Sequence, residues 1–329
     1  MTKQLTISVA AYNVEAYLRE TLSSCVAEEI LDEIEVLVVS DGSSDATADI
    51  AREYCEAYPG SFRLIEKENG GYGSTVNTAM REASGRYFRL LEGDDYFEKE
   101  GLLALVKALR CCDSDWVVTP YCRVADGSNV KEVKPPLWER YSGRTMKLSD
   151  TRGDIRFGMW GVTAKTEMLR RHPFLLPEHR LYTDQQFVVY MMPHVKTVTF
   201  LPELLYAYRV GREGQSVSRV SRIAHKADTV DSIRRILYFC GKKVSPDHPN
   251  RHAIRERAGV YLIYAFLTLM LEKPSLRNYR ELLSLMSYAK RISPDICEEA
   301  KRRKRLIRLL YASCGAAYFA RAGRIDNWN

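Results

Sequence analysis

The 329 residues of this chain lack the cysteine and histidine patterns of proteins that are stabilised by structural metal ions or disulfide bonds. No two of its eight cysteines form a C-x-x-C pair, and its six histidines include no H-E-x-x-H spacing. These absences argue against a structural zinc site and against a disulfide framework. Most cysteines stand in apolar patterns, where a free thiol behaves as a small hydrophobic side chain.

A long apolar segment is also missing. Near the C-terminal end, the longest stretch without a formal charge is Ala258–Leu271, which is short for a bilayer span and long enough for a buried helix. The first residues, MTKQLTISVAAYN, run into a strand pattern and lack the apolar block and small-residue cleavage site of a signal peptide. We therefore expect a cytoplasmic protein that does not span a membrane.

The net charge of +7 is concentrated at the C-terminal end. Residues 301–329 hold eight Lys and Arg and one acid, Asp326, which leaves 41 of the 49 basic and 41 of the 42 acidic residues for the rest of the chain. This distribution argues against a nucleic-acid-binding protein and for a local anionic contact of the tail.

The first part of the chain alternates strand-like and helix-like segments. Strand-like runs at 5–10, 34–39, 62–66 and 87–91 are separated by segments with a helical period, the first of which Asn13 can cap. This alternation predicts a mostly parallel sheet with right-handed crossovers. Ligands of such sheets bind at the carboxyl ends of the strands. Two acidic motifs, at Asp41 and at Asp94, stand at such ends.

The remainder of the chain is less regular and then helical. Trp116–Thr119 resembles a further strand, whereas 126–153 is rich in Gly, Pro, Ser and charge and is predicted to be loop. From about 222 onward the apolar positions again repeat with a helical period. The sequence contains no internal repeat and no low-complexity segment.

Four stretches, in this order, resemble glycosyltransferase family 2. They are SVAAYNVEAYLRETLSSC (8–25), IEVLVVSDGSSDAT (34–47), NGGYGSTVNTAMREASGRYFRLLEGDDYF (69–97), and YTDQQFVVY (182–190) followed by YAYRVGREGQSVS (206–218). The resemblance implies an α/β fold, with a Rossmann-like glycosyltransferase A-type sheet flanked by helices and a helical C-terminal extension. We expect a nucleotide-sugar-binding half at 1–120, an acceptor-binding and catalytic-base half at 121–220, and a helical region at 221–329.

Two of the expected donor contacts follow the first two strands. Tyr12 can stack on a nucleobase, and the resemblance assigns its segment, with Ala11, to the base; a half-buried aromatic residue at a helix entry is the alternative. Asp41 can accept a hydrogen bond from a pyrimidine N–H, and the matching aspartate of the family does so, which would favour uridine. A simple turn or capping role is the alternative for Asp41.

A glycine turn supplies further candidates on the donor side. Gly70, Gly71 and Gly73 could bring backbone N–H groups close to a pyrophosphate at a helix N-terminus. The full G-x-G-x-x-G pattern is absent because position 76 is Val, and this argues against a dinucleotide-binding site. Asn77 matches the family's asparagine on the following helix, which implies a donor contact; a solvated helix residue is the alternative.

The acidic turn Glu92-Gly93-Asp94-Asp95 is the candidate metal site. A departing diphosphate develops negative charge, which a hard divalent ion with carboxylate and phosphate ligands neutralises. Clustered carboxylates are unfavourable without a cation or solvent. The resemblance matches this turn to the family's D-x-D motif and implies Mg²⁺ or Mn²⁺, with Asp94 and Asp95 as stronger candidates than Glu92. A solvated acidic turn is the alternative.

Asp184 is the candidate catalytic base. Thr183-Asp184 matches the family's Glu-Asp pair, whose aspartate takes the proton of the acceptor hydroxyl as that oxygen attacks the anomeric carbon. A single in-line displacement of the diphosphate inverts the configuration at that carbon. A helix N-cap before 185–190 is the alternative, and both roles can hold at once.

Arginines and a tryptophan complete the candidate site. Arg209 and Arg212 could pair with phosphate oxygens, and the flanking glycines would let Arg212 close as part of a lid. Surface charges are the alternative for both. Trp160 could stack on an acceptor sugar, and a buried tryptophan is the alternative.

These observations predict an inverting glycosyltransferase that uses a nucleotide-diphosphate sugar, with UDP favoured, and a saccharide or lipid-linked acceptor. By analogy, polysaccharide or cell-surface glycan synthesis is the expected setting. A nucleotidyltransferase is one alternative, but it would need a basic, Gly-rich N-terminal loop, and positions 8–16 hold neither a basic residue nor a glycine. A noncatalytic nucleotide-sugar-binding protein is another; the presence of Asp94 and Asp184 disfavours it.

The basic tail allows a hypothesis beyond the family. Five cations at 301–305 precede apolar residues between 306 and 319. As a helix, 301–320 could lie on an anionic membrane surface, which would place the enzyme on the inner face of the plasma membrane. The alternative is that the helix packs as core and leaves its cations solvated.

Overall fold

The structure is a computed structural model that describes residues 3–128, 130–134, 138–151, 157–212 and 214–324. The chain forms two compact units. The sheet unit comprises Met1–Asp184 and His194–Arg212, and the helical unit comprises Gln185–Pro193 and Glu213–Asn329. The halves expected at 1–120 and 121–220 thus lie largely in one unit.

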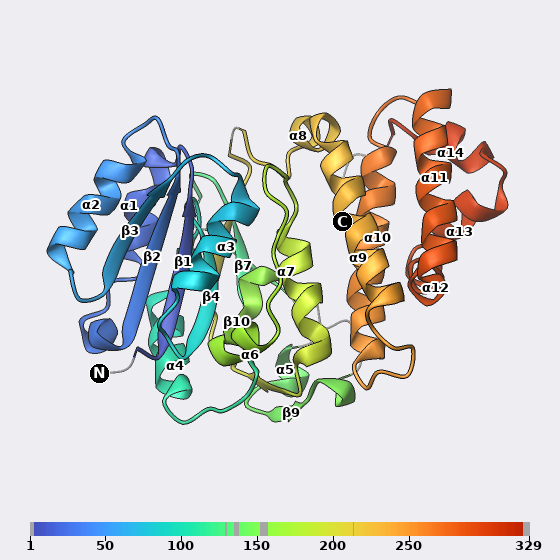
Figure 1. Cartoon of the computed structure of the whole chain (residues 1–329). Helices are drawn as coiled ribbons and strands as arrows, with labels where there is room; N and C mark the ends of the chain where they lie inside the picture. Colours follow the sequence, from blue (N-terminus) through green and yellow to red (C-terminus); the bar gives the residue numbers. More distant parts are fainter. Residues whose placement is uncertain (1–2, 129, 135–137, 152–156, 213, 325–329) are drawn as a thin grey trace. The chain divides into compact units, whose positions relative to one another are not determined.

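An eight-stranded sheet is the centre of the sheet unit (Figure 1). Its strands, in spatial order, are β3 (Phe62–Lys67), β2 (Ile34–Asp41), β1 (Leu5–Ala11), β4 (Tyr87–Glu92), β10 (Val162–Lys165), β6 (Trp116–Val118), β11 (Thr197–Phe200) and β9 (Thr145–Lys147). The first four are parallel, as the alternation predicted, whereas β10 is antiparallel to both its neighbours. Asp41 and Glu92 therefore stand at one edge, where parallel strands end.

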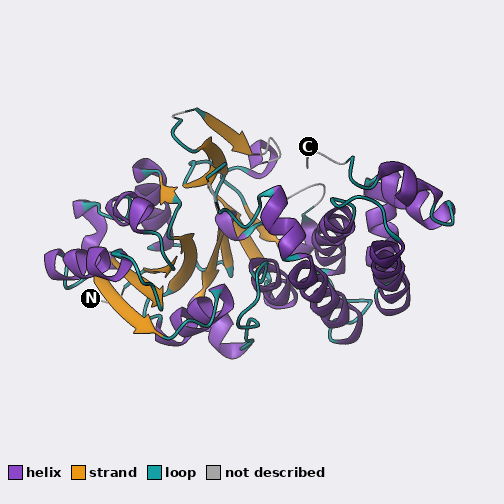
Figure 2. Ribbon diagram, turned by 90° about the horizontal axis from the view of Figure 1, so that it is seen from above, coloured by secondary structure: helices purple, strands orange, loops and turns teal. Residues whose placement is uncertain are grey.

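The parallel strands are covered on both faces. Val36, Leu37, Val38 and Val39 of β2 expose no surface, as a continuous apolar run predicts. The helices of this part of the chain are α1 (Glu15–Ser23), η1 (Glu28–Glu33), α2 (Thr47–Ala57), α3 (Tyr72–Glu82), α4 (Lys99–Leu109) and α6 (Thr166–Arg171). Figure 2 shows helices on either side of the strands. Of these, α3 packs on β1 and β2, so its first turn stands near the strand ends.

Two local predictions are wrong. Asn13 does not cap α1, because its φ is +49° and its side-chain oxygen accepts the Ser44 N–H (2.9 Å) across the sheet edge. The described part of 126–153 is not simply loop, since it forms short elements. These are β8 (Lys131–Lys134), α5 (Trp138–Tyr141), β9 and η2 (Leu148–Asp150).

A smaller sheet brings residues 206–210, which are far away in sequence, next to the end of β4. Its strands, in spatial order, are β5 (Tyr96–Phe97), β12 (Tyr206–Val210), β7 (Tyr121–Ala125) and β8. β12 pairs antiparallel with β5, which follows the acidic turn directly. This pairing places 206–210 next to Glu92–Asp95.

The helical unit contains most of α7 (Asp184–Met191), part of η4 (Met192–His194), and α8 (Arg219–Ala224), α9 (Lys226–Lys242), α10 (Arg251–Leu269), α11 (Leu276–Ile292), α12 (Pro294–Arg303), α13 (Arg305–Ala312) and α14 (Ala316–Arg321). α10 packs against α9, α11 and α12. Most of the stretch Ala258–Leu271 thus lies in a buried helix, as predicted. Across the described residues, we find no helix with the length and apolar character needed to cross a membrane.

The basic tail does not form one continuous helix. α12 ends at Arg303, and Lys304 has an extended backbone before α13 begins. Three of the five expected cations are paired within the unit: Lys301 pairs with Glu298, and both Arg302 and Arg303 pair with Glu299. The expected band of solvated cations is therefore largely neutralised.

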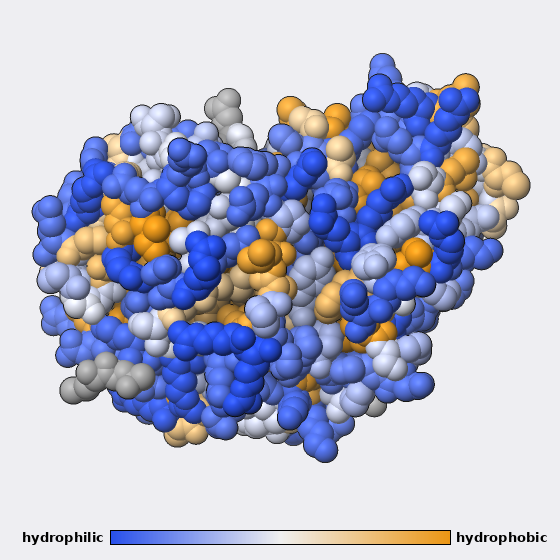
Figure 3. Space-filling view, viewed as in Figure 1, coloured by the Kyte–Doolittle hydropathy of each residue, from blue (hydrophilic) through white to orange (hydrophobic). Residues whose placement is uncertain are grey.

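The apolar residues of the tail are divided between core and surface. Ile307 and Tyr318 expose nothing and Leu310 exposes 5%, whereas Leu309 and Phe319 remain exposed. On the face shown in Figure 3, hydrophobic residues are interspersed with hydrophilic ones. The core alternative thus holds for part of this segment.

Candidate functional site

The acidic turn is fixed between β1 and α1. The Gly93 N–H donates to the carbonyl of Ala10 (2.9 Å), and a Cβ at Gly93 would lie 2.8 Å from that oxygen. The Thr21 hydroxyl lies 2.9 and 2.7 Å from the carbonyl oxygens of Gly93 and Asp95. Because the backbone is held in this way, the three acidic side chains of the turn have fixed and different surroundings.

Asp95 is buried and connects the turn to β12. Its carboxylate oxygens accept hydrogen bonds from the Tyr206 hydroxyl (2.6 Å) and the Arg209 backbone N–H (2.8 Å). The Tyr206 hydroxyl in turn accepts the Glu92 N–H (3.2 Å). Burial and the neighbouring Asp94 raise the pKa of Asp95. Metal ligation by Asp95 stays a prediction, and it would compete with these two hydrogen bonds.

Glu92 lies among like charges. Burial raises the pKa of Glu92 well above its ordinary value, and Asp94, Asp95 and Asp184 raise it further, while a hydrogen bond with the Tyr72 hydroxyl opposes the shift. Asp184 begins α7 and is far from the turn in sequence, but the fold brings it near enough for its charge to act on Glu92.

Two tyrosines line this carboxylate cluster, and the sequence did not single out the first of them. Tyr72 begins α3; its hydroxyl contacts Glu92 and lies 3.5 Å from the Met159 sulfur. Burial, followed by the charges of Glu92 and Asp184, raises the pKa of Tyr72. Burial and the same cluster also raise the pKa of Tyr208. Both hydroxyls therefore remain protonated donors. An aromatic residue inside a glycine turn was the available signal for Tyr72.

Arg209 is largely occupied by the protein itself. Only 8% of the residue is exposed, its Nε donates to the Asp94 carbonyl (2.9 Å), and its terminal nitrogens pair with Glu20 and Asp126. The guanidinium also lies over the Tyr17 ring, 5.0 Å from its centre. Arg209 thus fastens β12 to the acidic turn and α1. The surface-charge alternative is wrong for this residue.

Arg212 is the more accessible of the two arginines. Its Nε pairs with the carboxylate of Asp94, and the two side chains are 24% and 13% exposed. Gly211, with φ of +91°, precedes it in a conformation that favours glycine. Glu213, which belongs to the predicted flexible segment, lies outside the described residues. Arg212, a candidate for binding phosphate, is thus paired with Asp94, a candidate metal ligand.

Asp41 holds the glycine turn. One carboxylate oxygen accepts from the Gly70 N–H (2.9 Å) and from Lys67 (2.8 Å), and the other accepts from the Gly71 N–H (2.7 Å). Gly71 has φ of +77°, which favours glycine. Of the three glycine N–H groups predicted to meet a pyrophosphate, those of Gly70 and Gly71 donate to Asp41 in this structure.

The remaining donor candidates have different surroundings. Tyr12 follows β1 and is 52% exposed, which is compatible with stacking and with the half-buried alternative. Ala11 is buried at the end of β1, opposite Ser40 of β2. Asn77 is 3% exposed, so the solvated alternative is wrong; its side-chain amide exchanges two hydrogen bonds with the backbone of Leu176 (2.9 Å each).

Trp160 lies in η3 (Met159–Gly161) within an aromatic group. Its ring is 5.1 Å from those of both Tyr121 and Tyr208, with interplanar angles of 30° and 29°. Its carbonyl accepts a hydrogen bond from Arg89 of β4, a fully buried side chain whose pKa burial lowers to about 9. The ring is partly buried, so acceptor stacking by Trp160 stays a prediction.

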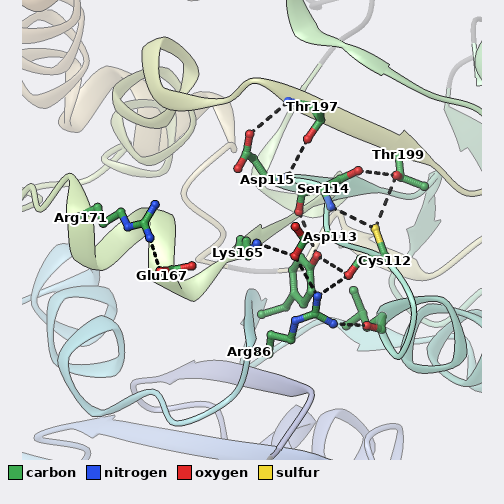
Figure 4. Close-up of polar contacts among 12 residues, drawn as sticks. Arg86, Cys112, Asp113, Ser114, Asp115, Lys165, Glu167, Arg171, Thr197 and Thr199 are labelled. Atoms are coloured by element: carbon green, nitrogen blue, oxygen red, sulfur yellow. Dashed lines mark hydrogen bonds and ion pairs between the residues drawn. The ribbon is translucent and has the colours of Figure 1, made fainter.

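The amino end of β4 carries a different polar group (Figure 4). Arg86 and Lys165 both pair with Asp113 (3.0 and 2.6 Å), and Arg86 also donates to the carbonyl of Cys112 (2.7 Å). Hydrogen bonds and charge from Lys165 and Arg86 lower the pKa of Asp113. Each charge in this group therefore has an opposite partner.

Among the described residues, no three His, Cys, Asp or Glu side chains are arranged to hold a metal ion by themselves. Glu92 and Asp94 could supply two carboxylate ligands to a metal ion. A divalent ion held there would need oxygen ligands from a bound molecule or water.

The fold is that of solved glycosyltransferases with an A-type sheet. The structure of Staphylococcus aureus TarS 1–349 in complex with UDP-GlcNAc has a TM-score of 0.73 and 20% identity, and the match covers 98% of this chain and 90% of that one. The mannosyltransferase PcManGT from Pyrobaculum calidifontis, in complex with GDP-Man and Mn²⁺, has a TM-score of 0.55 and 18% identity, covering 97% and 88%. At these identities the likeness is one of fold.

The chain matches the model of glycosyl transferase family 2 over residues 6–165. It is 26% identical over 215 residues to the putative glycosyltransferase EpsH of Bacillus subtilis, covering 64% of this chain and 61% of EpsH. It is 27% identical over 222 residues to the poly(ribitol-phosphate) beta-N-acetylglucosaminyltransferase TarS of S. aureus, covering 65% of this chain and 37% of TarS. The chain thus spans less than two thirds of either relative.

Proposed function

We propose that this protein is an inverting glycosyltransferase that uses a nucleotide-diphosphate sugar. The observation that supports the proposal is the acidic turn at the carboxyl end of β4, where Glu92 and Asp94 stand and where the charge of Asp184 also acts on Glu92, within the part of the chain that matches family 2. A base for the acceptor and an acidic site for a metal–diphosphate group are the two parts that such a transfer needs.

UDP is the proposed nucleotide, and UDP-GlcNAc is the first donor to test, because the similar TarS structure holds it. Tyr12 would stack on the base beside the backbone of Ala11. Three donors occupy Asp41, so about one acceptor position of its carboxylate remains for a uracil N–H. Gly71 shapes the turn that Asp41 holds. We assign Asn77 no donor contact, since its amide holds Leu176.

The carboxylate cluster fits a divalent cation. The charged form of Glu92 is disfavoured by burial and by Asp94 and Asp95, and a cation would offset this repulsion. Mg²⁺ or Mn²⁺ can be held by one or two carboxylates together with phosphate oxygens. Glu92 and Asp94 would supply the carboxylates. When bound, the ion would neutralise charge on the departing diphosphate.

The chain's own residues perform the rest of the reaction. Asp184 takes the proton of the acceptor hydroxyl, whose oxygen forms the new bond to the anomeric carbon as the bond to the diphosphate breaks. Arg212 leaves Asp94 and pairs with phosphate oxygens of the donor. Arg209 stays in place, because Glu20, Asp126 and the Asp94 carbonyl hold it. Attack opposite the leaving group inverts the anomeric centre.

The acceptor is proposed as a saccharide or a lipid-linked saccharide, with Trp160 and Tyr208 on its side of the site, in polysaccharide or cell-surface glycan synthesis. We do not extend the proposal to a membrane contact of 301–320. Lys301, Arg302 and Arg303 are paired within the helical unit, and part of the apolar surface that such a contact needs is buried.

A hydrolysis screen tests this function. The protein is incubated with UDP-GlcNAc, GDP-Man and other nucleotide sugars, with and without Mn²⁺, and nucleoside diphosphate release is measured. We expect release from a UDP-sugar that depends on Mn²⁺ and falls in Asp184→Asn. Pyrophosphate release from a nucleoside triphosphate and a sugar phosphate would instead indicate a nucleotidyltransferase. Tight UDP-sugar binding without turnover, even with acceptor saccharides, would indicate a noncatalytic protein.

A further inference from the structure

The segment that leads to Asp184 has a strained backbone. His179 and Tyr182 have φ of +52° and +61°, and they are two of only four non-glycine residues with positive φ among the described residues. Such conformations are unfavourable for residues other than glycine and persist only where the surroundings hold them. The position of Asp184 therefore depends on contacts that hold 176–183 in place.

Asn77 provides one of these contacts. Its side-chain nitrogen donates to the Leu176 carbonyl (2.9 Å), and its side-chain oxygen accepts the Leu176 N–H (2.9 Å). Both residues are nearly fully buried, at 3% and 2% exposure. An amide supplies a donor and an acceptor together, which a carboxylate or a hydroxyl at this position cannot do in the same geometry.

The glycine turn provides the others. The His179 N–H donates to the Gly70 carbonyl (2.6 Å), and a Cβ on Gly71 would lie 3.1 Å from the His179 nitrogen. A Cβ on Gly73 would lie 2.2 Å from the Pro177 carbonyl oxygen, closer than any side chain allows. The backbone of 176–179 therefore lies directly against the first turn of α3.

The turn itself is held from its other side. Asp41, at the end of β2, accepts the N–H groups of Gly70 and Gly71. A continuous series of contacts thus runs from β2 through the glycine turn to His179, and Asn77 joins the same segment at Leu176. All of these residues belong to the sheet unit.

We propose that Asn77 is a positioning residue for the catalytic base: through Leu176, and together with the glycine turn, it fixes the 176–183 segment and so sets where Asp184 stands relative to the acidic turn. This inference rests on the proposed role of Asp184. It replaces the donor contact expected for Asn77 with a contact to the protein. A displacement of a catalytic group by about 1 Å can cost roughly 100-fold in rate.

Amide hydrogen exchange tests the contact without an activity assay. In Asn77→Ala, we expect faster exchange in the peptide that contains Leu176 and His179, with unchanged exchange in β1 and β2. Gly73→Ala is a second variant, which should loosen the same peptide by pushing on Pro177. Gly60→Ala is its control, since a Cβ there has nothing within 4 Å. Unchanged exchange of 176–183 in both variants would overturn the proposal.

The kinetic test separates positioning from donor binding. UDP release from the best donor of the hydrolysis screen and UDP affinity are measured for wild type, Asn77→Ala, Asp184→Asn and the double variant. We expect Asn77→Ala to lower the rate roughly 10- to 100-fold with UDP affinity within about twofold, and to have almost no further effect when Asp184 is already Asn.

Three results would count against the proposal. A fall in UDP affinity that matches the fall in rate would restore the donor contact. If the reductions in rate of the two single variants multiply in the double variant, Asn77 does not act through Asp184. If Asn77→Ala does not fold, Gly73→Ala must show the same result, a lower rate with unchanged UDP affinity. Gly241→Ala is its control, because a Cβ there would lie equally close (2.0 Å) to a backbone oxygen in the helical unit. Full activity of Asp184→Asn would instead contradict the base assignment, and the exchange result would then still test the contact.

Discussion

The two ends of β4 carry charged groups of opposite character. At the amino end, Asp113 lies between Arg86 and Lys165, and its pKa is lowered (Figure 4). At the carboxyl end, Glu92 lies among Asp94, Asp95 and Asp184, and its pKa is raised. The same strand thus begins beside a carboxylate that has two cationic partners and ends among crowded carboxylates.

This difference indicates where a ligand is needed. The charges at the amino end are satisfied by the chain itself, so this group can act as a structural tie between β4 and β10. At the carboxyl end, Arg212 pairs with Asp94, but Glu92 remains in surroundings that disfavour its charge. Perturbed carboxylates at a strand end are typical of functional sites, and a cation with a diphosphate would balance them.

The largest effect should come from Asp184→Asn, which removes the base and keeps the shape of the side chain. We expect sugar transfer or donor hydrolysis to fall by roughly two to four powers of ten. UDP affinity should stay near the wild-type value, because the base does not hold the donor. Single-turnover rates together with UDP titration measure both quantities, and a rate like that of wild type would assign the base to another residue.

Asp94→Asn should have the next largest effect, on the metal requirement. Loss of even an outer partner of a metal ligand typically costs roughly 10- to 100-fold in metal affinity, so loss of a charged ligand should lower the apparent Mn²⁺ affinity at least as much. The Mn²⁺ dependence of donor hydrolysis measures it. Glu92→Gln is the comparison and should shift the dependence less, because Glu92 stands where the family's D-x-D motif has its first aspartate and its side chain is one methylene longer. An unchanged Mn²⁺ dependence in Asp94→Asn would remove this residue from the metal site.

Asp95→Ala should act on stability more than on metal binding. It leaves the Tyr206 hydroxyl and the Arg209 N–H without their acceptor, which costs roughly 1–3 kcal/mol for each buried donor. Urea unfolding measures the loss in the free energy of unfolding. Asp95→Asn keeps an acceptor for Arg209 and should cost less. A stable Asp95→Ala protein that has lost only its Mn²⁺ dependence would restore Asp95 as a ligand.

Asp113→Asn should have the smallest effect. It removes a carboxylate from the other end of β4, where the side chain is 79% exposed. An exposed ion pair contributes little to stability. We expect donor hydrolysis, Mn²⁺ dependence and the unfolding midpoint to match those of wild type. Loss of activity in this variant would show that the two ends of the strand are not independent.

The sequence predicted the parallel part of the fold because its signals are local. The run Ile34–Val39 is apolar throughout, and acidic residues follow both β2 and β4, so strands and strand ends could be located without a structure. The resemblance then matched Asp184 to the family's catalytic base, although only the fold brings this residue near the acidic turn.

The remaining site contacts join residues far apart in sequence and have no local pattern. Nothing in the sequence of α3 indicates that Asn77 holds Leu176 or that Asp41 accepts the N–H groups of the glycine turn. Arg209 looks like a loop charge until Glu20 and Asp126 are seen beside it. The basic tail is a different case, because Glu298 and Glu299 lie only three or four residues before their cationic partners, and these ion pairs follow the local spacing of a helix.

UDP titration with and without Mn²⁺ tests the central claim most directly. Calorimetry on the wild-type protein should give UDP binding that Mn²⁺ strengthens at least roughly tenfold, since the metal joins the diphosphate to the acidic turn. The same gain should appear in Asp113→Asn and disappear in Asp94→Asn. UDP binding that is absent, or equally strong in all three proteins with and without Mn²⁺, would contradict the assignment of the carboxyl end of β4 as a metal-assisted nucleotide-sugar site.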